Sequence, residues 1–162
     1  MRVGVLHPGE MGVTVLESLM ANGVSATWVK EGRSESTIRR ARSVPSLDTL
    51  EDLAHSVETI ISVCPPSAAL DVASSIFDRG FKGIYVDANA ISPLESRKIA
   101  ELFGAAFVDG GIIGPPAKEA GTTRIYLSGK RSREVVDLFK IGPLELSLIH
   151  ISEPTRPLYS AY

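Results

Sequence analysis

The sequence is poor in cysteine, in long apolar runs and in clustered metal-binding residues. Cys64 is the sole cysteine of the 162 residues, so an internal disulfide cannot form and a cytoplasmic protein is the default expectation. Its apolar runs are too short for a membrane span, and residues 1–5 do not resemble a secretory signal. The histidines, His7, His55 and His150, lack metal-ligand spacing, which argues against a metal site.

The charge of the chain is nearly balanced, and basic residues form no cluster. Lys and Arg number 17 against 19 Asp and Glu, which gives a net charge of −2. Nucleic acid and anionic membranes are therefore not expected as main partners. The hydrophobic content of 44% and charged content of 22% are those of an ordinary globular protein.

Short β-branched segments alternate with helix-length amphipathic segments along most of the chain. This alternation predicts an α/β protein with a doubly wound, mostly parallel Rossmann-type sheet and helices on both faces. The predicted strands are Arg2–Leu6, Ser25–Val29, Ser43–Val44, Thr59–Val63, Gly83–Asp87, Ala106–Asp109 and Arg124–Ser128. The predicted helices are Glu10–Asn22, a polar helix through Arg39 and Arg40, a helix capped by Asp48 that ends near His55, Ser67–Phe77, Pro93–Phe103 and Ser132–Phe139.

A glycine-containing turn follows the first predicted strand. The dinucleotide-binding fingerprint needs a tight turn, close approach of backbone to the pyrophosphate, and close packing of helix on strand. Gly9 and Gly12 fill the second and third roles, while His7 replaces the first glycine. Because Pro8 follows, His7 is expected to be extended and the turn to begin one residue later. The predicted cofactor-binding residues here are His7, Pro8, Gly9, Glu10, Met11 and Gly12.

Two features of this turn predict weaker binding than a standard fingerprint. Pro8 has no backbone N–H to donate, and Glu10 adds a negative charge where phosphate is expected, although it also suits the helix dipole.

The loop after the second predicted strand bears on the choice between NAD and NADP. Glu31 follows Gly12 by 19 positions, where a carboxylate binds the ribose hydroxyls of NAD. Arg33 and Ser34 suit the 2′-phosphate of NADP instead. We therefore favour NADP and keep NAD as the alternative, while the arginines of the following helix are expected to face solvent.

Three strand ends have distinctive compositions: Ser62–Pro66, Asp87–Pro93 and Asp109–Gly114. Ligands of doubly wound sheets lie at the carboxyl ends of the strands, so these segments are candidates for the rim of a cofactor site. They could equally be ordinary turns capped by Asp87 and Asn89. Because no histidine is paired with the cysteine in the sequence, it is interpreted as a small core residue and not a nucleophile.

Taken together, the segments at His7–Gly12, Ser62–Pro66, Val86–Asn89 and Phe107–Gly114 resemble one family. It is the 6-phosphogluconate dehydrogenase-like and 3-hydroxyisobutyrate dehydrogenase-like superfamily of β-hydroxyacid dehydrogenases. The more similar branch carries a distinctive C-terminal helical domain. The resemblance covers Arg2 to Glu145. It implies an N-terminal NAD(P)-binding domain, a homodimeric parent protein, and hydride transfer between the nicotinamide and a β-hydroxyacid carbon.

The resemblance also assigns roles to particular residues. The pyrophosphate would be lined by Gly9, Met11 and Gly12, and the adenosine ribose approached by Arg33 and Ser34. Cys64 and Pro65 would border the cofactor, with Asn89 near the nicotinamide. The substrate-binding motif is matched by Gly111, Ile112, Ile113 and Gly114. Ile113 stands where better-known members have a serine, so a hydroxyl that would hold a substrate carboxylate or hydroxyl is missing.

The catalytic lysine of the superfamily lies on a helix of the second domain, which is expected to be absent from this chain. Lys118, Lys130 and Lys140 do not lie in the matching motif, so no catalytic residue is assigned. We expect the parent to be an NAD(P)-dependent oxidoreductase and this chain to be inactive alone. A non-catalytic nucleotide-sensing module is the alternative.

From Leu146 onward the sequence resembles a translated sequencing adaptor. We therefore predict an NAD(P)-binding domain over 1–145 and a non-native tail over 146–162. The apolar alternation of 146–148 could still add an edge strand to the sheet. Little order is expected beyond Pro154.

Overall fold

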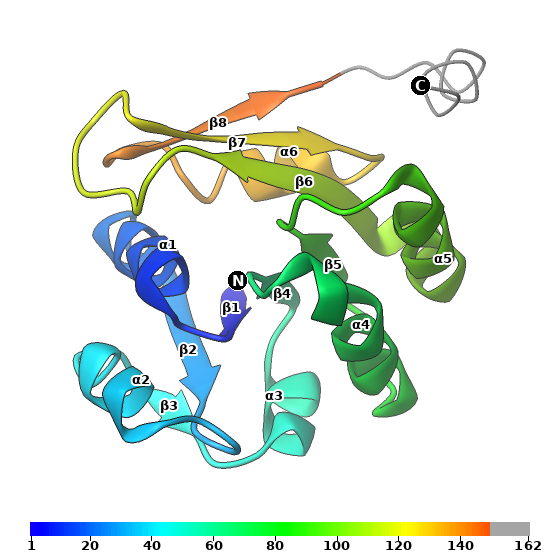
Figure 1. Ribbon diagram of the computed structural model, residues 1–162, viewed down its shortest axis with the longest axis horizontal. Coiled ribbons are helices and arrows are strands. Elements are labelled where there is room, and N and C mark those ends of the chain that lie inside the picture. The colour runs from blue at the N-terminus through cyan, green and yellow to red at the C-terminus, as the bar shows by residue number, and fades with distance from the viewer. Residues whose placement is uncertain (150–162) are drawn as a thin grey trace.

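The computed structural model describes residues 1–149. They form one eight-stranded sheet in the order β3-β2-β1-β4-β5-β6-β7-β8 (Figure 1). The strands are β1 (Arg2–Leu6), β2 (Ser25–Val29), β3 (Ser46–Leu47), β4 (Thr59–Ser62), β5 (Ile84–Asp87), β6 (Phe107–Ile113), β7 (Thr123–Ser128) and β8 (Leu144–Leu148). Every neighbouring pair is parallel except β6 and β7.

Helices cover both faces of this sheet (Figure 1). The α-helices are α1 (Glu10–Ala21), α2 (Glu35–Arg40), α3 (Leu50–Ser56), α4 (Ala69–Asp78), α5 (Pro93–Phe103) and α6 (Ser132–Val136), and short 3₁₀ turns span Pro66–Ala68 and Gly104–Ala106. Helices α1 and α6 contribute to the core on one face, whereas α3, α4 and α5 contribute to the core on the other. The predicted fold class is therefore confirmed.

Successive residues of the central strands alternate between the two cores. In β1, Val5 faces the α1 side and Leu6 the α3 side; in β4, Ile61 and Ile60 divide in the same way. Both faces are buried, which explains why these strands are almost continuously apolar instead of alternating with polar residues.

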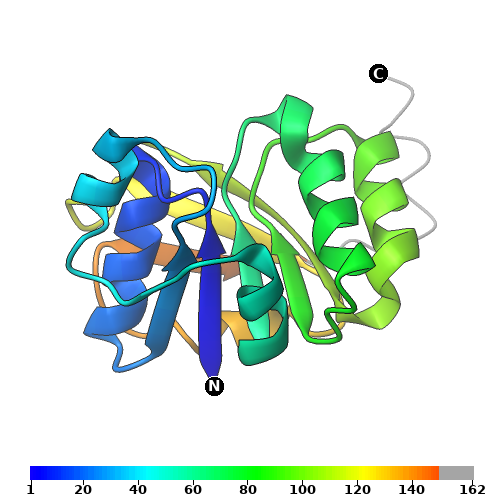
Figure 2. The ribbon, with the colours of Figure 1, turned by 90° about the horizontal axis from the view of Figure 1, so that it is seen from below.

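The strand order reverses at β1, and this reversal positions the site. From β1 the sheet grows outward to β2 and β3, and the chain then returns to place β4 on the other side of β1. The loops after β1 and β4 therefore diverge and leave a crevice at the carboxyl ends of the strands. Figure 2 shows β1 rising from the N-terminus to that edge. Among residues 1–149, no helix is long and apolar enough to cross a membrane.

The third strand and the third helix begin later than predicted. The expected strand at Ser43–Val44 is wrong, because this segment is held by side chains of β2: the Nε1 of Trp28 donates to the carbonyl of Val44 at 3.0 Å. Strand pairing starts only at Ser46. Thr49, not Asp48, caps α3 by accepting from the backbone N–H of Asp52 at 3.1 Å.

The sixth strand is longer than the predicted Ala106–Asp109. The Gly-rich segment that follows Asp109 continues as strand, because it pairs with antiparallel β7 as far as Ile113 and Arg124. A Cβ on Gly110 would lie 2.8 Å from the Leu127 side chain, so glycine allows the strand to pass here.

The end of the described chain also differs in detail. Helix α6 ends at Val136 and not at Phe139. The expected edge strand after residue 145 is confirmed as part of β8, which pairs with β7. Because β8 crosses residue 145, the division of the chain at that residue stays a prediction. The segment beyond Pro154 lies outside the described residues.

Candidate functional site

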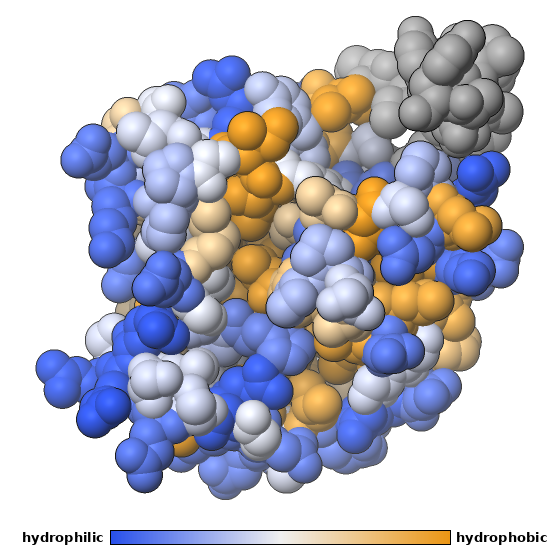
Figure 3. Space-filling model, viewed as in Figure 1, coloured by the Kyte–Doolittle hydropathy of each residue, from blue (hydrophilic) through white to orange (hydrophobic). Residues whose placement is uncertain are grey.

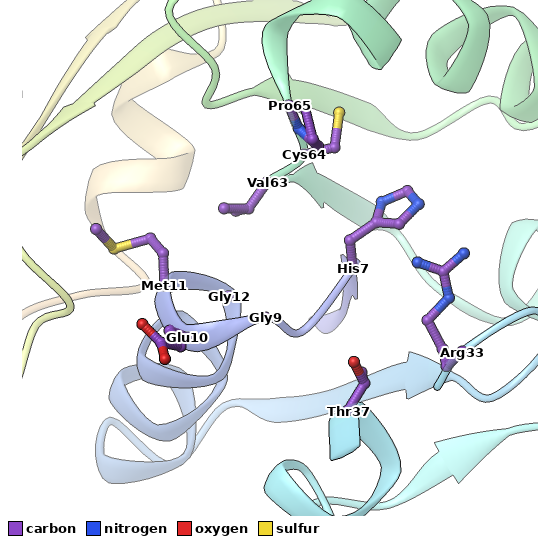
Figure 4. A pocket seen from close by; sticks show the side chains of 10 residues that line it. All are labelled: His7, Gly9, Glu10, Met11, Gly12, Arg33, Thr37, Val63, Cys64 and Pro65. Carbon is purple, nitrogen blue, oxygen red and sulfur yellow. The ribbon is translucent and has the colours of Figure 1, made fainter. Parts of the chain in front are cut away.

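A pocket of about 460 Å³ opens at the crevice between the loops that follow β1 and β4 (Figure 4). Its lining residues are His7, Gly9, Glu10, Met11, Gly12, Arg33, Thr37, Val63, Cys64 and Pro65. All of them except Thr37 and Val63 are among the predicted cofactor-binding residues. Val63 lies within the strand-end segment already singled out. Thr37 reaches the pocket only because α2 starts at Glu35 and turns this hydroxyl toward it.

His7 adopts a backbone conformation that the sequence argument does not predict. Its φ is +61°, the only positive value of a non-glycine residue within residues 1–149. The carbonyl of His7 accepts a hydrogen bond from the Gly9 N–H at 2.7 Å, so the chain turns through Pro8 at once. The expectation of an extended His7 is therefore wrong. The closed turn outweighs the steric preference of the residue before proline, at a backbone cost of about 1–3 kcal/mol.

Gly12 and Gly9 serve different purposes in this turn. A Cβ on Gly12 would lie 2.6 Å from the carbonyl oxygen of His7, so only glycine lets α1 pack this closely on the end of β1. A Cβ on Gly9 would meet nothing closer than 4.0 Å, so the Gly9 backbone faces open space. These are the packing and close-approach roles expected of the fingerprint glycines.

The first turn of α1 has no side-chain cap within the described chain. Gly9 is the N-cap residue, and no side chain accepts from the N–H groups behind it. The residues that carry those N–H groups line the pocket, and the positive end of a helix dipole beside a pocket suits an anion. The carboxylate of Glu10 is exposed and points away from His7 and Arg33 in Figure 4.

The loop after β2 divides the predicted nucleotide-binding residues. Arg33 lines the pocket, and its guanidinium reaches toward His7 (Figure 4). Glu31 does not line it; the Glu31 carboxylate accepts from the Leu50 N–H at 3.0 Å and so caps α3. Ser34 does not line it either, because its hydroxyl caps α2 by accepting from the Thr37 N–H at 3.3 Å.

Asn89 joins the ends of β4 and β5. Its side-chain oxygen accepts from the Cys64 N–H at 2.7 Å, and its amide nitrogen donates to the hydroxyl of Ser62 at 3.4 Å. The backbone N–H of Asn89 in turn donates to Asp87 Oδ1 at 2.9 Å. Asp87 and Asn89 thus cap turns, as one of the two interpretations expects, and in doing so they also support a wall of the pocket.

Burial shifts the pKa of three groups in and behind the pocket. Burial and the charge of Arg33 lower the pKa of His7 to about 4. Burial raises the pKa of the Cys64 thiol, which keeps it protonated and fits the interpretation that it is not a nucleophile. Asp87 is fully buried, and this burial raises its pKa to about 6 despite the hydrogen bonds from Asn89.

A second pocket of about 300 Å³ lies at the ends of β5, β6 and β7. Its lining residues are Asn89, Ala90, Ile91, Asp109, Gly110, Gly111, Ile113, Tyr126, Ser128 and Ile149. Of the predicted substrate-binding residues, Gly111 and Ile113 border it. Ile112 packs against the core on the α1 side, and Gly114 lies against the Thr122 backbone.

The second pocket is apolar at its mouth and has one charged lining group. Ile113 is 64% exposed, and apolar side chains gather in a band across this face of the molecule (Figure 3). Asp109 accepts a hydrogen bond from the Ser96 hydroxyl at 2.8 Å. Neither Lys nor Arg is among the described lining residues. Within residues 1–149, no three His, Cys, Asp or Glu side chains group to hold a metal ion.

Comparisons with known proteins give relatives that are longer than this chain. No family model matches the sequence. An uncharacterized 28.5 kDa protein from the 7S RNA 5′ region of Methanothermus fervidus is 34% identical over 150 residues, which cover 90% of this chain and 58% of that protein.

Among the solved structures that share the fold, two illustrate the similarity. The conserved protein MTH1747, of unknown function and described as structurally similar to 3-hydroxyacid dehydrogenases, matches with a TM-score of 0.77 and 33% identity, over 91% of this chain and 57% of its own. The 3-hydroxyisobutyrate dehydrogenase of Mycobacterium tuberculosis matches with a TM-score of 0.77 and 13% identity, over 98% of this chain and 58% of its own. The chain thus spans just over half the length of these proteins.

Proposed function

We propose that this chain, which has the fold of the N-terminal NAD(P)-binding domain of the 3-hydroxyisobutyrate dehydrogenase-like superfamily, binds a nicotinamide dinucleotide in the pocket between β1 and β4. One observation carries the proposal. Gly12 packs α1 against the carbonyl of His7, and the uncapped first turn of that helix opens into a pocket of about 460 Å³. An anion-accepting helix end beside a pocket of this size is what a dinucleotide requires.

The residues of the pocket fit the parts of such a cofactor. The pyrophosphate would lie on the N–H groups at the start of α1, where Gly9 leaves the backbone open. Cys64 and Pro65 would border the cofactor on the β4 side. We favour NADP over NAD because Arg33 faces the pocket, whereas the carboxylate that would bind the ribose hydroxyls of NAD is committed to the N–H of Leu50.

For the whole protein we propose hydride transfer between NADP(H) and a β-hydroxyacid-type substrate. The bound cofactor would give or take the hydride. The second pocket, which is lined by Asn89 and linked through it to the loop after β4, would border the reacting carbon. No Lys or Arg of residues 1–149 lines that pocket, so a substrate carboxylate would need a cation from a further domain.

The lysine that the family resemblance implies for proton transfer to and from the substrate hydroxyl would also come from outside this domain. Among residues 1–149, no lysine lines either pocket. We therefore expect the 162-residue chain to bind the cofactor without turning over substrate, because loss of general acid–base catalysis alone costs a factor of about 10²–10⁴.

A fluorescence titration with NADPH tests the binding proposal. We expect saturable binding by the chain and its loss in Gly9→Val, which adds bulk at a position where a Cβ meets no atom closer than 4.0 Å. Ala21→Val is the matched control, because it adds bulk at the exposed far end of the same helix. Absence of a saturable signal at millimolar NADPH would overturn the proposal.

A further inference from the structure

His7 occupies a position that a glycine would fill at lower cost. It has a positive φ, which side chains other than that of glycine seldom adopt. The turn that imposes this φ is fixed by the Gly9–His7 hydrogen bond and by the contact of Gly12 with the same carbonyl. A strained residue at the rim of a binding pocket is a candidate for a functional role.

One nitrogen of the His7 imidazole lacks a hydrogen-bond partner among the described residues. Its Nδ1 atom is buried and makes no hydrogen bond within residues 1–149. An unsatisfied buried nitrogen is costly unless a ligand or a proton completes it.

The charged and titratable groups around His7 come from three elements of the pocket. Arg33 approaches from the loop after β2 and Cys64 from the loop after β4 (Figure 4). Glu10, at the start of α1, directs its carboxylate away from the ring. Arg33 and burial therefore act together against the protonated imidazole, with no carboxylate of the pocket facing it to oppose them, and the pKa of His7 falls to about 4.

We propose that His7 takes up a proton when a phosphate group binds beside Arg33, so that the two side chains recognise the phosphate as a pair of cations. The inference rests on the proposed function, since a dinucleotide would bring the phosphate. A phosphate carries a negative charge of up to two, opposite to and at least as large as that of Arg33. It therefore reverses the electrostatic effect that keeps the ring neutral, and the protonated ring can donate from both nitrogens.

His7 and Arg33 could recognise either of two groups of a dinucleotide, the 2′-phosphate or the pyrophosphate. The 2′-phosphate of NADP is favoured, because Arg33 and the Thr37 hydroxyl lie on the same side of the pocket as the ring, away from Glu10 (Figure 4). The pyrophosphate is the other source, and NAD would bring it as well. Comparing the two cofactors separates these sources.

The test follows the ring protons of His7 by NMR at pH 5.5, with its signals assigned from their loss in His7→Gln. We expect a neutral ring without ligand and a protonated ring with saturating NADP⁺, a rise in its pKa of about two units. His55, exposed on α3, serves as the reference signal. A change with NADP⁺ alone identifies the 2′-phosphate, and a change with NAD⁺ as well identifies the pyrophosphate.

Failure of the inference and failure of the proposed function have different signatures. If NADP⁺ displaces NADPH in the fluorescence titration while His7 stays neutral, the inference is wrong and the proposed function stands. If neither cofactor binds, 2′-AMP replaces them in the same NMR measurement. Protonation of His7 on addition of 2′-AMP would then support the proposed phosphate site, and a ring that stays neutral would overturn that proposal. With binding intact, we also expect His7→Gln to weaken NADP⁺ binding about tenfold at pH 5.5 and less at pH 8.

Discussion

The side-chain oxygen of Asn89 accepts a hydrogen bond from the backbone N–H of Cys64 at 2.7 Å, across 25 positions of sequence. This bond joins the loop that ends β4 to the loop that ends β5. One loop borders the first pocket and the other borders the second. Asn89 therefore supports a wall of the first pocket without lining that pocket itself.

Asn89→Ala should lower both stability and cofactor affinity. The change leaves a part-buried N–H at Cys64 without its partner, which costs about 1–3 kcal/mol, and it frees the loop that borders the pocket. Urea unfolding and NADPH titration measure the two effects. Asn22→Ala is the control, because Asn22 also ties two segments together by accepting from the N–H groups of Lys140 and Ile141. It should lower stability and leave NADPH affinity unchanged; equal losses of affinity would contradict the assignment.

Alanine at the two glycines of the turn should have unequal effects on stability. Gly12→Ala forces α1 away from the His7 carbonyl and should cost about 1–3 kcal/mol. Gly9→Ala meets no atom closer than 4.0 Å, and we expect a change within about 0.5 kcal/mol. Chemical denaturation of both variants measures the difference, and similar unfolding free energies would show that Gly12 does not fix the packing.

Asp87→Asn should change the pH dependence of stability. The pKa of Asp87 is raised from 3.8 to about 6 in the folded state, so between these values the folded chain keeps a proton that the unfolded chain has released. Stability therefore falls as pH rises through this range, by up to about 3 kcal/mol. The variant should match the natural chain near pH 4 and exceed it at pH 7.

His7 acts in the opposite direction, because its pKa is lowered from 6.5 to about 4 and its contribution to stability rises with pH over that range. The comparison between Asp87→Asn and the natural chain removes this common term. Parallel curves of unfolding free energy against pH would refute the role given to Asp87.

Arg33→Ala should weaken NADPH binding more than NADH binding. Loss of one charge-assisted contact to the 2′-phosphate predicts about a tenfold or greater change for NADPH. Arg39→Ala removes an equal charge from the exposed surface of α2 and should change neither affinity. Equal losses for both cofactors in Arg33→Ala would mean that the guanidinium does not select the 2′-phosphate.

Glu31→Ala should behave as the loss of a helix cap. It removes the acceptor of the Leu50 N–H at the start of α3 and should lower stability by about 1 kcal/mol. NADH affinity, measured in parallel, should not change. A marked loss of NADH binding would show instead that this carboxylate serves the cofactor.

Particular residues show how much of the site can be predicted from the sequence. The glycines of the turn, the helix behind them and the strand-end motif around Cys64 could be predicted because each depends on local pattern. Thr37 could not, since its place in the pocket depends on where α2 begins. The capping role of Glu31 could not be predicted either, because its partner Leu50 lies 19 positions away at the start of α3.

The sequence by itself determined the alternation of strands and helices, and hence the α/β class and the edge of the sheet at which a ligand would bind. It also placed most of the pocket residues, because local periodicity and turn chemistry act over a few neighbouring positions. The conformation of His7, the extension of β6 through Ile113 and the link from Asn89 to Cys64 were decided only by the tertiary structure. The link from Asn89 to Cys64 spans 25 positions, and β6 continues to Ile113 because it pairs with β7. The conformation of His7 depends on a closed turn and on the packing of α1 against its carbonyl, which together outweigh the local preference of the backbone.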